Sequence, residues 1–508
     1  MIHRLAHPGP RKLGGAPSTL APAQLALQLQ QGVAHHQQGK LQQAQTHYEA
    51  VLHHAPRNLD ALHLLGVVAA QTRNPLRALA LFDQALEINP AYADAWSNRG
   101  IALKELTRFA QALESFDKAL TLKPGLADAH NNRGLVLHEL QRLDDALTSY
   151  EQALKLRPQF AQAHYNRGCL LNALNRYNEA IEAYDRALAL LPGYAEARFN
   201  KSIALLRHGA FEEAWPLYES RWDVEHAAYV QGEFAAPLWL GQQPLHGKTI
   251  LLRAEQGLGD NLQFCRYATL LAAQGAQVVL ETPKPLMRVL AGLVGVDTLV
   301  EKGKAAVDFD YHCPLLSLPL ALNTAVATIP TPGAYLAADT AKAQAWSVRL
   351  GAATRPRVGL VWSGNRAHKN DANRSLSLGQ LLGFLPSGCE YISLQKEVRS
   401  QDREALAQSH VAHFGEVLDD FSDTAALCAQ LDVVLSVDTS VAHLAGAMGK
   451  STWLLLPLLP DWRWLLERND SPWYPSMKLY RQSASHTWEP VLARVGADLQ
   501  TLALGWEP

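Results

Sequence analysis

The stretch Leu431–Pro457, LDVVLSVDTSVAHLAGAMGKSTWLLLP, decides the fold class of the second half of the chain. Its pattern predicts a buried strand, a tight turn, a helix of small residues and a second strand. The turn presents Asp438, Thr439 and Ser440 at the start of the helix, and His443 follows one turn later. Because a helix N-terminus offers unpaired N–H groups and a partial positive charge, we interpret this turn as a phosphate-binding site.

The same stretch ends in Gly449-Lys450-Ser451-Thr452, which imitates the end of a Walker A loop. The first glycine of that loop would fall at position 444, which is Leu444. The order of elements is also reversed, because this glycine ends a helix and a strand follows it. Gly449 therefore predicts a helix C-terminus, and an ATPase function is excluded.

The surrounding sequence has an α/β texture. Short apolar strands alternate with helical stretches from residue 248 onward, which predicts two Rossmann-like halves with a cleft between them. We place the first half at residues 248–337, a helical connection at 338–356 and the second half at 357–508. A strand over 249–255 leads through Gly257-Leu258-Gly259-Asp260 into a predicted helix over 261–275. The third glycine of a dinucleotide fingerprint is missing, since Leu262 stands there, so NAD binding is not expected. Gly257 and Gly259 are candidate nucleotide-sugar-binding residues instead.

The second half supplies further candidate ligands at its strand ends. Ligands of open α/β sheets bind beyond the C-terminal ends of the strands. Two predicted strands end there in polar residues, and Arg374 in the following loop has the fork that suits a pyrophosphate. The simpler alternative for each is a solvated loop residue. The strand-end candidates are Ser363, Gly364, Asn365, Gln395 and Lys396.

The first half of the chain is a repeat array. Proline recurs at an interval of 34 residues, and so does glycine. Between them alanine–aromatic–alanine triplets recur in the same phase, which is the tetratricopeptide pattern. We place about six repeats at residues 25–228, after a disordered leader at 1–24 and before a junction at 229–247. The phased residues are Pro56, Pro90, Pro124, Pro158, Pro192, Gly32, Gly66, Gly100, Gly134 and Gly168.

An asparagine also recurs with the repeat, at Asn98, Asn132, Asn166 and Asn200. It lies on the first helix of each repeat, which lines the concave face of such arrays. A carboxamide carries both a donor and an acceptor, so it can pair with a peptide backbone of any sequence. These residues predict a peptide-binding ladder; the alternative is an ordinary solvated or inter-repeat role.

Composition narrows the classes of partner. The chain has 508 residues and a formal net charge of −2, which argues against a nucleic-acid or anionic-membrane binder. Its five cysteines show no paired spacing, so we expect neither a disulfide framework nor a zinc site. The same pattern predicts a cytoplasmic location. No apolar run approaches the ~20 residues that a membrane helix needs.

The motifs QGLGDNLQF, VGLVWSGN and SVDTSVAHLAGAMGK resemble the heptosyltransferase family of glycosyltransferases (family 9), which has the GT-B fold. The tail PDWRWLLERNDSPWYPSMKLYRQ is similar to a bacterial subgroup in which tetratricopeptide arrays precede this domain, and the asparagine ladder resembles that of the O-linked N-acetylglucosamine transferases. The resemblance implies inverting, metal-independent transfer from a nucleotide-sugar, which is a co-substrate, so no cofactor is expected. Some members with this layout modify proteins.

The resemblance also implies roles for individual residues. Asp260 would be the general base, which takes the proton of the acceptor hydroxyl; the alternative is a helix N-cap, and the two roles can coexist. Asp438 and Thr439 match the family's pair at the diphosphate, although Ser440 stands where the family usually has glycine. His443 would donate to a phosphate oxygen of the leaving group. The resemblance further implies that Asp438, Thr439 and His443 face Asp260 across the cleft between the two halves.

These observations predict a glycosyltransferase that modifies a hydroxyl of a protein held by the repeat groove. Two alternatives remain open. The acceptor can be lipopolysaccharide or another glycan, with the array recruiting partners, or the second half can be an inactive domain of an interaction scaffold.

Overall fold

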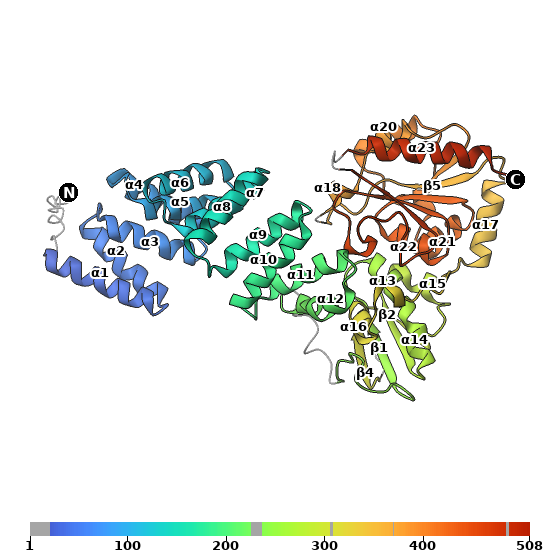
Figure 1. The fold of residues 1–508 in the computed structure, drawn as a ribbon, viewed down its shortest axis with the longest axis horizontal. Helices are drawn as coiled ribbons and strands as arrows, with labels where there is room; N and C mark the ends of the chain where they lie inside the picture. Colours follow the sequence, from blue (N-terminus) through green and yellow to red (C-terminus); the bar gives the residue numbers. More distant parts are fainter. Residues whose placement is uncertain (1–20, 225–235, 305–307, 369, 484–486, 508) are drawn as a thin grey trace, which may run out of the picture. The chain divides into compact units, whose positions relative to one another are not determined.

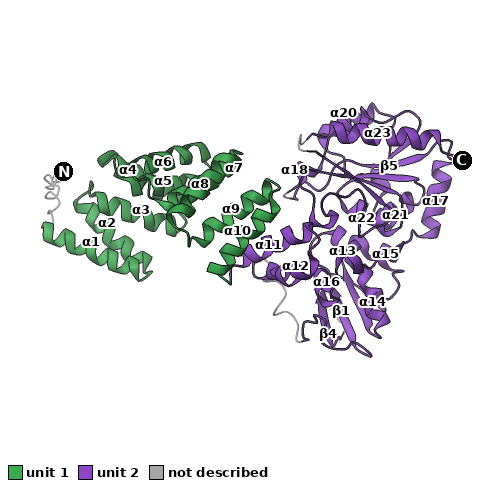
Figure 2. Ribbon diagram, in the orientation of Figure 1, with its two compact units in different colours: residues 1–193 green, residues 194–508 purple. Residues whose placement is uncertain are grey.

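A computed structural model describes residues 21–224, 236–304, 308–368, 370–483 and 487–507. The chain divides into two compact units, unit 1 (Met1–Gly193) and unit 2 (Tyr194–Pro508) (Figure 2). Most of the predicted leader, residues 1–20, lies outside the described residues, and the first helix begins at Pro22, within the range assigned to that leader. No helix in the described part of the chain is long and apolar enough to cross a membrane.

Unit 1 is all-helical over its described residues (Figure 1). Consecutive helices form pairs, and the helices have nearly constant length. The second helix of each pair ends two residues before one of the phased prolines, because proline cannot continue a helix. The helices are α1 (Pro22–Gln37), α2 (Leu41–His54), α3 (Leu59–Gln71), α4 (Pro75–Ile88), α5 (Ala93–Glu105), α6 (Phe109–Leu122), α7 (Ala127–Glu139), α8 (Leu143–Leu156), α9 (Ala161–Ala173) and α10 (Tyr177–Leu190).

The phased glycines let the two helices of each repeat approach each other. A Cβ added to Gly66 would stand 2.6 Å from the ring of Phe82, and one added to Gly134 would stand 2.6 Å from the ring of Tyr150. The same contact recurs at the other three glycines, each with the aromatic residue 16 positions later. The aromatic ring therefore fills the space left by the glycine of its own repeat, and the rings are fully buried.

Arginines bridge successive helices of the array. Arg99 on α5 donates to Asp83 on α4 and to Ser115 on α6, both at 2.7 Å. Arg133, one repeat later, repeats this arrangement with Asp117 and Ser149. Each of these two arginines joins its own repeat to the preceding one by polar contacts beside the apolar core.

The turn inside each pair has a second periodic feature. Arg73, Thr107, Gln141 and Asn175 lie 34 residues apart and adopt the left-handed conformation, with φ between 56° and 61°. Glycine occupies the equivalent turn at Gly39 and Gly209, and it adopts positive φ there without the Cβ penalty. The turn geometry is thus the same in every repeat, although only the first and the last turn of the series use glycine.

Unit 2 begins with one more helix pair. Helix α11 (Ala195–Arg207) and helix α12 (Phe211–Tyr218) are followed by a 3-10 turn, η1 (Glu219–Trp222). These elements match the last predicted repeat, yet they are compact with the α/β part rather than with unit 1. Part of the predicted junction, residues 229–235, lies outside the described residues.

The rest of unit 2 contains two parallel sheets. The first has the order β3-β2-β1-β4 and comprises β1 (Thr249–Arg253), β2 (Gln277–Thr282), β3 (Thr298–Glu301) and β4 (Tyr311–Pro314). The second has the order β10-β9-β8-β5-β6-β7 and comprises β5 (Arg357–Val361), β6 (Glu390–Ser393), β7 (Ala412–His413), β8 (Val433–Val437), β9 (Thr452–Leu456) and β10 (Met477–Arg481). All paired strands are parallel, and β5 and β8 are buried along their whole length, as parallel strands covered on both faces should be.

Helices flank both sheets and join the strands (Figure 1). They are α13 (Leu258–Phe264), α14 (Ala268–Ala273), α15 (Met287–Leu290), α16 (Leu318–Ala321), α17 (Thr340–Leu350), α18 (Asp371–Arg374), α19 (Leu378–Leu382), α20 (Arg403–Ala407), α21 (Phe421–Cys428), α22 (Ser440–Ala447) and α23 (Glu489–Leu504). The predicted single helix over 261–275 is wrong: it starts earlier and is broken by a 3-10 turn at Cys265–Tyr267. That break contains buried Arg266, which donates to the carbonyls of Gln263 and Trp473.

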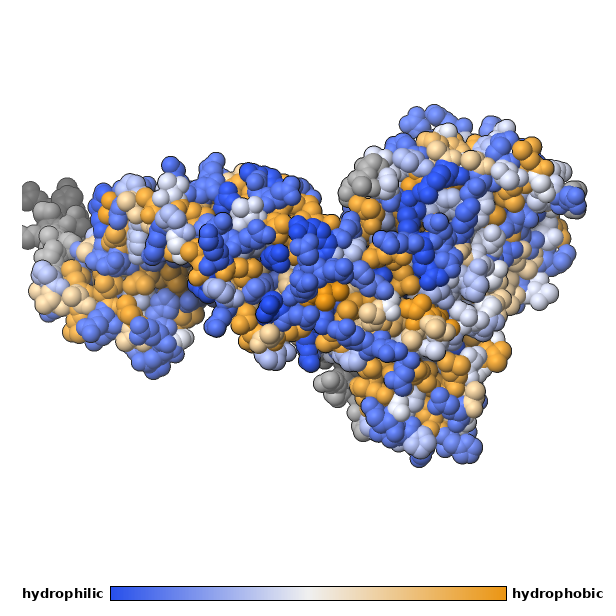
Figure 3. All heavy atoms as spheres, in the orientation of Figure 1, coloured by the Kyte–Doolittle hydropathy of each residue, from blue (hydrophilic) through white to orange (hydrophobic). Residues whose placement is uncertain are grey.

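Polar and apolar residues are intermixed on the surface of each unit (Figure 3). The exposed apolar residues include leucines near the ends of the second helices, such as Leu122, Leu156 and Leu190. The large apolar clusters are internal. One joins the second sheet to α19 and α23, and another runs through the first repeats.

Candidate functional site

Two helices that begin at the C-terminal ends of strands meet in unit 2. Strand β1 leads into α13 and strand β8 leads into α22, and the two helices pack against each other (Figure 1). Their contact is close: a Cβ added to Gly259 would stand 2.7 Å from Cδ2 of His443. The structure therefore brings together the predicted segments 257–260 and 438–443, which are far apart in the sequence.

Asp260 lies at the third position of α13. Gly257 is the N-cap, so the alternative role considered for Asp260, as the N-cap of this helix, is wrong. Instead, Oδ2 of Asp260 accepts a hydrogen bond of 2.8 Å from the backbone N–H of Gly257, and Oδ1 accepts from Arg463. Its side chain is 17% exposed. Burial raises the pKa of Asp260, against the lowering influence of the Arg463 guanidinium.

Arg463 clamps this carboxylate. It lies in the 3-10 turn Trp462–Trp464 (η8), and besides Asp260 it donates to Gln263 at 2.7 Å and to Asp461 at 2.8 Å. Its Cζ lies 4.3 Å from the centroid of the Trp462 ring, a cation–π distance. The side chain is 7% exposed. One arginine therefore joins a carboxylate on α13, next to the first sheet, to a carboxylate in the loop between β9 and β10 of the second sheet.

His443 is buried within α22 and is held from two sides. Its Nδ1 lies 2.9 Å from the hydroxyl of Tyr474, and its ring stacks on Trp464 with 5.3 Å between centroids. Burial, together with the positive charge of Arg463, lowers the pKa of His443 to about 3. The imidazole is neutral near pH 7. If Nδ1 accepts from Tyr474, Nε2 carries the proton, and Nε2 lies 4.0 Å from Oδ1 of Asp438.

The Asp438–Ser440 turn is where the sequence predicted it. Thr439 is the N-cap of α22 and Ser440 its first residue. The Thr439 hydroxyl lies 3.2 Å from that of Ser436, and no side-chain bond caps the helix at Thr439. Burial and the nearby Asp461 raise the pKa of Asp438 to about 6. Burial acts in the same direction on Asp461, but Arg463 outweighs it, and the pKa of Asp461 is lowered.

Arg374 reaches this turn. Its NH1 donates to the carbonyl of Asp438 at 2.8 Å, and its Nε lies 3.7 Å from Asp371. Nε is buried and has no hydrogen-bond acceptor among the described residues. Gly364 faces the guanidinium, because a Cβ there would stand 2.6 Å from NH2. Two of the predicted ligands, Gly364 and Arg374, are thus adjacent at the Asp438 turn.

The other predicted ligands of the second half make contacts within and between the loops at the strand ends. Ser363 is buried, and its N–H donates to Gln395, whose amide donates to the carbonyl of Glu397. The Asn365 side chain accepts from the N–H of Ala367 at 2.9 Å. Lys396 donates to the carbonyl of Asp419 at 2.6 Å. Their assignment as nucleotide-sugar ligands stays a prediction.

The ladder asparagines of unit 1 make contacts within the array. The amide of Asn98 lies 2.9 Å from His63 Nε2, that of Asn132 donates to the carbonyl of Asp128, and that of Asn166 donates to Asn131. Asn166 is 5% exposed. Asn200 lies on α11 and therefore in unit 2, so the four are not members of one compact unit. Their peptide-binding role stays a prediction, and a bound peptide would have to exchange with these contacts.

Sequence reasoning missed four residues of this site: Asp461, Arg463, Trp464 and Tyr474. All lie in the tryptophan-rich tail that was noted only for its resemblance. The available signal was the density of arginine, aspartate and aromatic side chains directly after strand β9, where an open parallel sheet places ligand contacts.

Comparison with known proteins concerns mainly the first part of the chain. The tetratricopeptide repeat family matches residues 29–93, 97–161, 131–195 and 165–229. The N-terminal region is a tetratricopeptide array. This confirms the repeats that the 34-residue period predicted, and the last match extends through the helix pair that is compact with unit 2.

Individual relatives are distant. Protein FlbA of Caulobacter vibrioides is 25% identical over 323 residues, covering 58% of this chain; the chain spans about half, 53%, of that relative's length. Among solved structures, a thermophilic TPR protein of Thermus thermophilus, TTC0263, is 26% identical, with 36% of this chain and 99% of that chain covered and a TM-score of 0.32. PilF of Pseudomonas aeruginosa is 22% identical, with 40% and 91% covered and a TM-score of 0.37.

Proposed function

We propose that this protein is a glycosyltransferase of the GT-B type whose tetratricopeptide array binds a protein acceptor. The proposal depends on one observation above all, the packing of Gly259 against His443. This contact brings α13, which carries the Asp260 carboxylate, next to the turn between β8 and α22. A strand, turn and helix in this order are typical of phosphate-binding sites. Both the carboxylate and this turn stand beyond the C-terminal ends of parallel strands, where α/β folds bind ligands.

The Asp438 turn is proposed to hold the nucleotide diphosphate. The N-terminus of α22 supplies N–H groups, and Arg374 and Arg463 supply positive charge next to it. A neutral His443 with its proton on Nε2 can donate one hydrogen bond to a phosphate oxygen. Ser363, Gly364, Asn365, Gln395 and Lys396 would complete the donor site around the base, ribose and phosphates.

Asp260 is proposed to be the base of an inverting transfer. The acceptor hydroxyl oxygen forms a bond to the anomeric carbon, its proton passes to the Asp260 carboxylate, and the bond to the nucleotide diphosphate breaks with its electron pair. Each carboxylate oxygen has two acceptor positions, and the contacts with Gly257 and Arg463 occupy one on each. A position therefore remains for the acceptor hydroxyl.

Three experiments test the proposal. Screening the full-length protein by thermal shift against ADP-, UDP-, GDP- and CMP-sugars should give a rise in Tm with at least one, because a ligand of the folded state stabilises it by mass action. Cell proteins incubated with that nucleotide-sugar and with this protein should then contain a modified acceptor that mass spectrometry detects, and the same incubation without this protein should not. Asp260→Asn should lower the rate by about 10²-fold or more while donor binding persists. Asp498→Asn is the matched control, because it removes a carboxylate of α23 that is paired with Lys478 of β10.

A protein that only binds partners is the second candidate, and two observations favour it. Asp260 is held by Arg463, and Ser440 replaces the glycine that the resemblance leads one to expect. The lack of a shift with every nucleotide-sugar would support a scaffold, whereas full activity of Asp260→Asn would contradict only the assignment of Asp260 as the base. A modified glycan or lipid instead of a protein would keep the transferase and change only the acceptor.

A further inference from the structure

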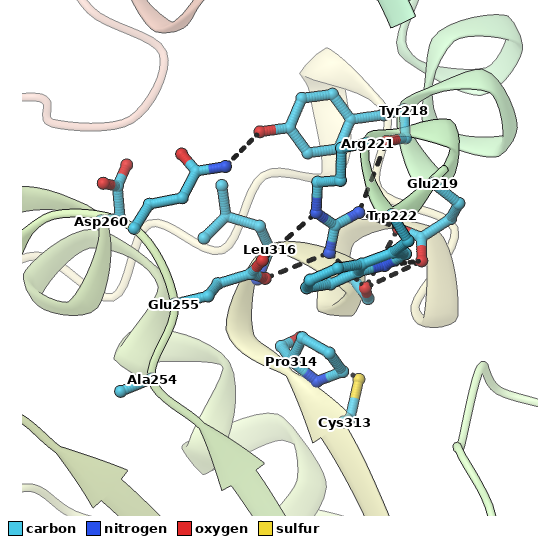
Figure 4. A network of polar contacts seen from close by, with 12 residues as sticks. Tyr218, Glu219, Arg221, Trp222, Ala254, Glu255, Asp260, Cys313, Pro314 and Leu316 are labelled. Atoms are coloured by element: carbon cyan, nitrogen blue, oxygen red, sulfur yellow. Dashed lines mark hydrogen bonds and ion pairs between the residues drawn. The ribbon is translucent and has the colours of Figure 1, made fainter. Parts of the chain in front are cut away.

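The turn that leads into the helix of Asp260 is held by the end of the last helix pair of the repeat region and by the 3-10 turn that follows it. Strand β1 ends at Arg253, and residues Ala254–Gly257 lead into α13. Figure 4 shows Tyr218, Glu219, Arg221 and Trp222 facing this turn, with Asp260 on the adjoining helix. The contact lies within unit 2 and joins η1 to the end of the first sheet.

Arg221 is the centre of the contact. Its Nε and NH2 donate to the two oxygens of Glu255 at 3.2 and 3.1 Å, a bidentate arrangement. The remaining nitrogen donates to Glu219, and NH2 also donates to Ser317 at 2.7 Å. The side chain is 5% exposed, and its Cζ lies 4.2 Å from the Trp222 ring centroid. Burial disfavours the charge, yet Glu255 and Glu219 raise the pKa of Arg221, so it stays protonated.

Glu255 passes this restraint to the backbone. One of its oxygens also accepts from the N–H of Leu316 at 2.7 Å, so Glu255 is fixed from two sides. Gln256 follows with a backbone φ of 53°, which residues other than glycine rarely adopt. Its side-chain amide donates to the Tyr218 hydroxyl at 3.3 Å. Asn261 donates to the carbonyls of Glu255 and Gly257 from the other side. Gly257 then donates its N–H to Asp260.

We propose that Arg221 is a positioning residue for Asp260, and that it acts through Glu255 and the turn 255–257. The α11–α12–η1 segment is then part of the transferase machinery, although its sequence is that of a repeat. Aromatic packing supports the same division of the chain. Trp215 donates to the carbonyl of Thr324 at 2.8 Å, and Phe211 stacks on Trp473. This inference rests on the proposed function for its catalytic consequence, but not for the restraint itself.

Hydrogen exchange of the full-length protein measures the restraint without any substrate. In Arg221→Met, amides of residues 255–262 should exchange about tenfold faster or more than in the wild type, because the turn loses its anchor. Arg133→Met is the matched control, since it removes an arginine with an analogous aspartate–serine pair in unit 1. The control should leave exchange in 255–262 unchanged. The double variant Arg221→Met/Glu255→Gln should exchange more slowly than Arg221→Met, because it removes the unpaired carboxylate.

Kinetics then measure the catalytic consequence. With the sugar donor found by thermal shift, Arg221→Met should lower kcat about tenfold or more and leave the donor Kd within about twofold, since a displaced base affects the chemical step and not donor binding. Tyr218→Phe removes only the hydroxyl that Gln256 contacts and should show smaller changes of the same kind. It serves as the test if Arg221→Met does not fold.

Unchanged exchange in 255–262 in folded Arg221→Met overturns the proposal, and so does equal acceleration by Arg133→Met. Where Arg221→Met does not fold, unchanged exchange there in Tyr218→Phe has the same consequence. Accelerated exchange with an unaltered kcat also overturns it, because the turn would then be mobile without effect on Asp260. If the wild-type protein transfers no sugar, the proposed function fails, and the exchange data alone decide whether Arg221 fixes the turn.

Discussion

Gly259 and His443 are in direct contact across the two α/β halves of unit 2. A Cβ at position 259 would stand 2.7 Å from Cδ2 and 3.4 Å from Nε2 of the histidine, and 3.5 Å from the Cα of Ser440. The ring cannot move aside freely, because it stacks on Trp464 and contacts the Tyr474 hydroxyl. The distance between α13 and α22 therefore depends on a residue without a side chain.

Gly259→Ala should separate α13 from α22. Overpacking of this kind costs about 1–3 kcal/mol, which exceeds the gain of about 1 kcal/mol in helix propensity. The free energy of unfolding from urea titration should fall, and activity should fall with it. Gly379→Ala is the control, because Gly379 lies in helix α19 with nothing within 4 Å of an added Cβ. A Gly259→Ala protein as stable as the control would contradict the contact.

Loss of Arg463 should leave two partly buried carboxylates without the arginine that contacts both of them. Arg463→Met is expected to lower the free energy of unfolding by about 1–3 kcal/mol at pH 8, because Asp260 and Asp461 lose this partner while solvent still screens Asp461. The folded pKa of Asp260 would rise further above its unfolded value, so the variant should regain stability as the pH falls through that raised folded pKa. Thermal unfolding at pH 5 and pH 8 measures this. Adding Asp461→Asn should recover part of the loss at pH 8.

His443 should make the wild type sensitive to mild acid. Its folded pKa is about 3, against about 6.5 in the unfolded chain. Below pH 6.5 the unfolded state binds a proton that the folded state does not, so this residue costs the fold about 2 kcal/mol on going from pH 8 to pH 5. His443→Asn lacks that contribution. The difference in free energy of unfolding between the wild type and the variant should shrink by about this amount over the same interval; a constant difference would show that His443 titrates normally in the fold.

Thr107 is a site where glycine should stabilise the array. It is β-branched and adopts φ of 56°, which costs about 1–2 kcal/mol, whereas glycine loses about 0.5–1 kcal/mol in backbone entropy. Thr107→Gly should raise the free energy of unfolding by up to about 1 kcal/mol in urea titrations followed by circular dichroism. Thr121→Gly, inside helix α6, should lower it by a similar amount.

The periodic features were predictable from the sequence because each follows from local geometry. The 34-residue spacing of Gly66 and Pro90 sets helix contacts and helix ends, and the apolar runs before Gly257 and Asp438 are strands. The pairing of segments 257–260 and 438–443 was predicted only through a family resemblance, and the structure places them together.

What the sequence did not reveal depends on long-range contacts. Arg463 lies 203 residues after Asp260, and nothing in its local pattern indicates that partner. Likewise, α11 and α12 carry the repeat signature, and only their packing against the 3-10 turn Trp462–Trp464 and α16 assigns them to unit 2. A repeat helix and a helix of an α/β domain bury the same kind of apolar face, so periodicity alone cannot separate them.

The boundary after Gly193 makes the length of the array an engineering variable. Each repeat of unit 1 is 34 residues long and ends in a proline, and Pro192 is the last of these before the α/β unit takes over. Whole repeats can be duplicated or excised upstream of that residue without altering a contact of Asp260 or Arg221. Chimaeras joined at Gly193 would therefore combine a foreign array with an intact unit 2. A junction after Tyr218 would instead remove α11 and α12 from unit 2.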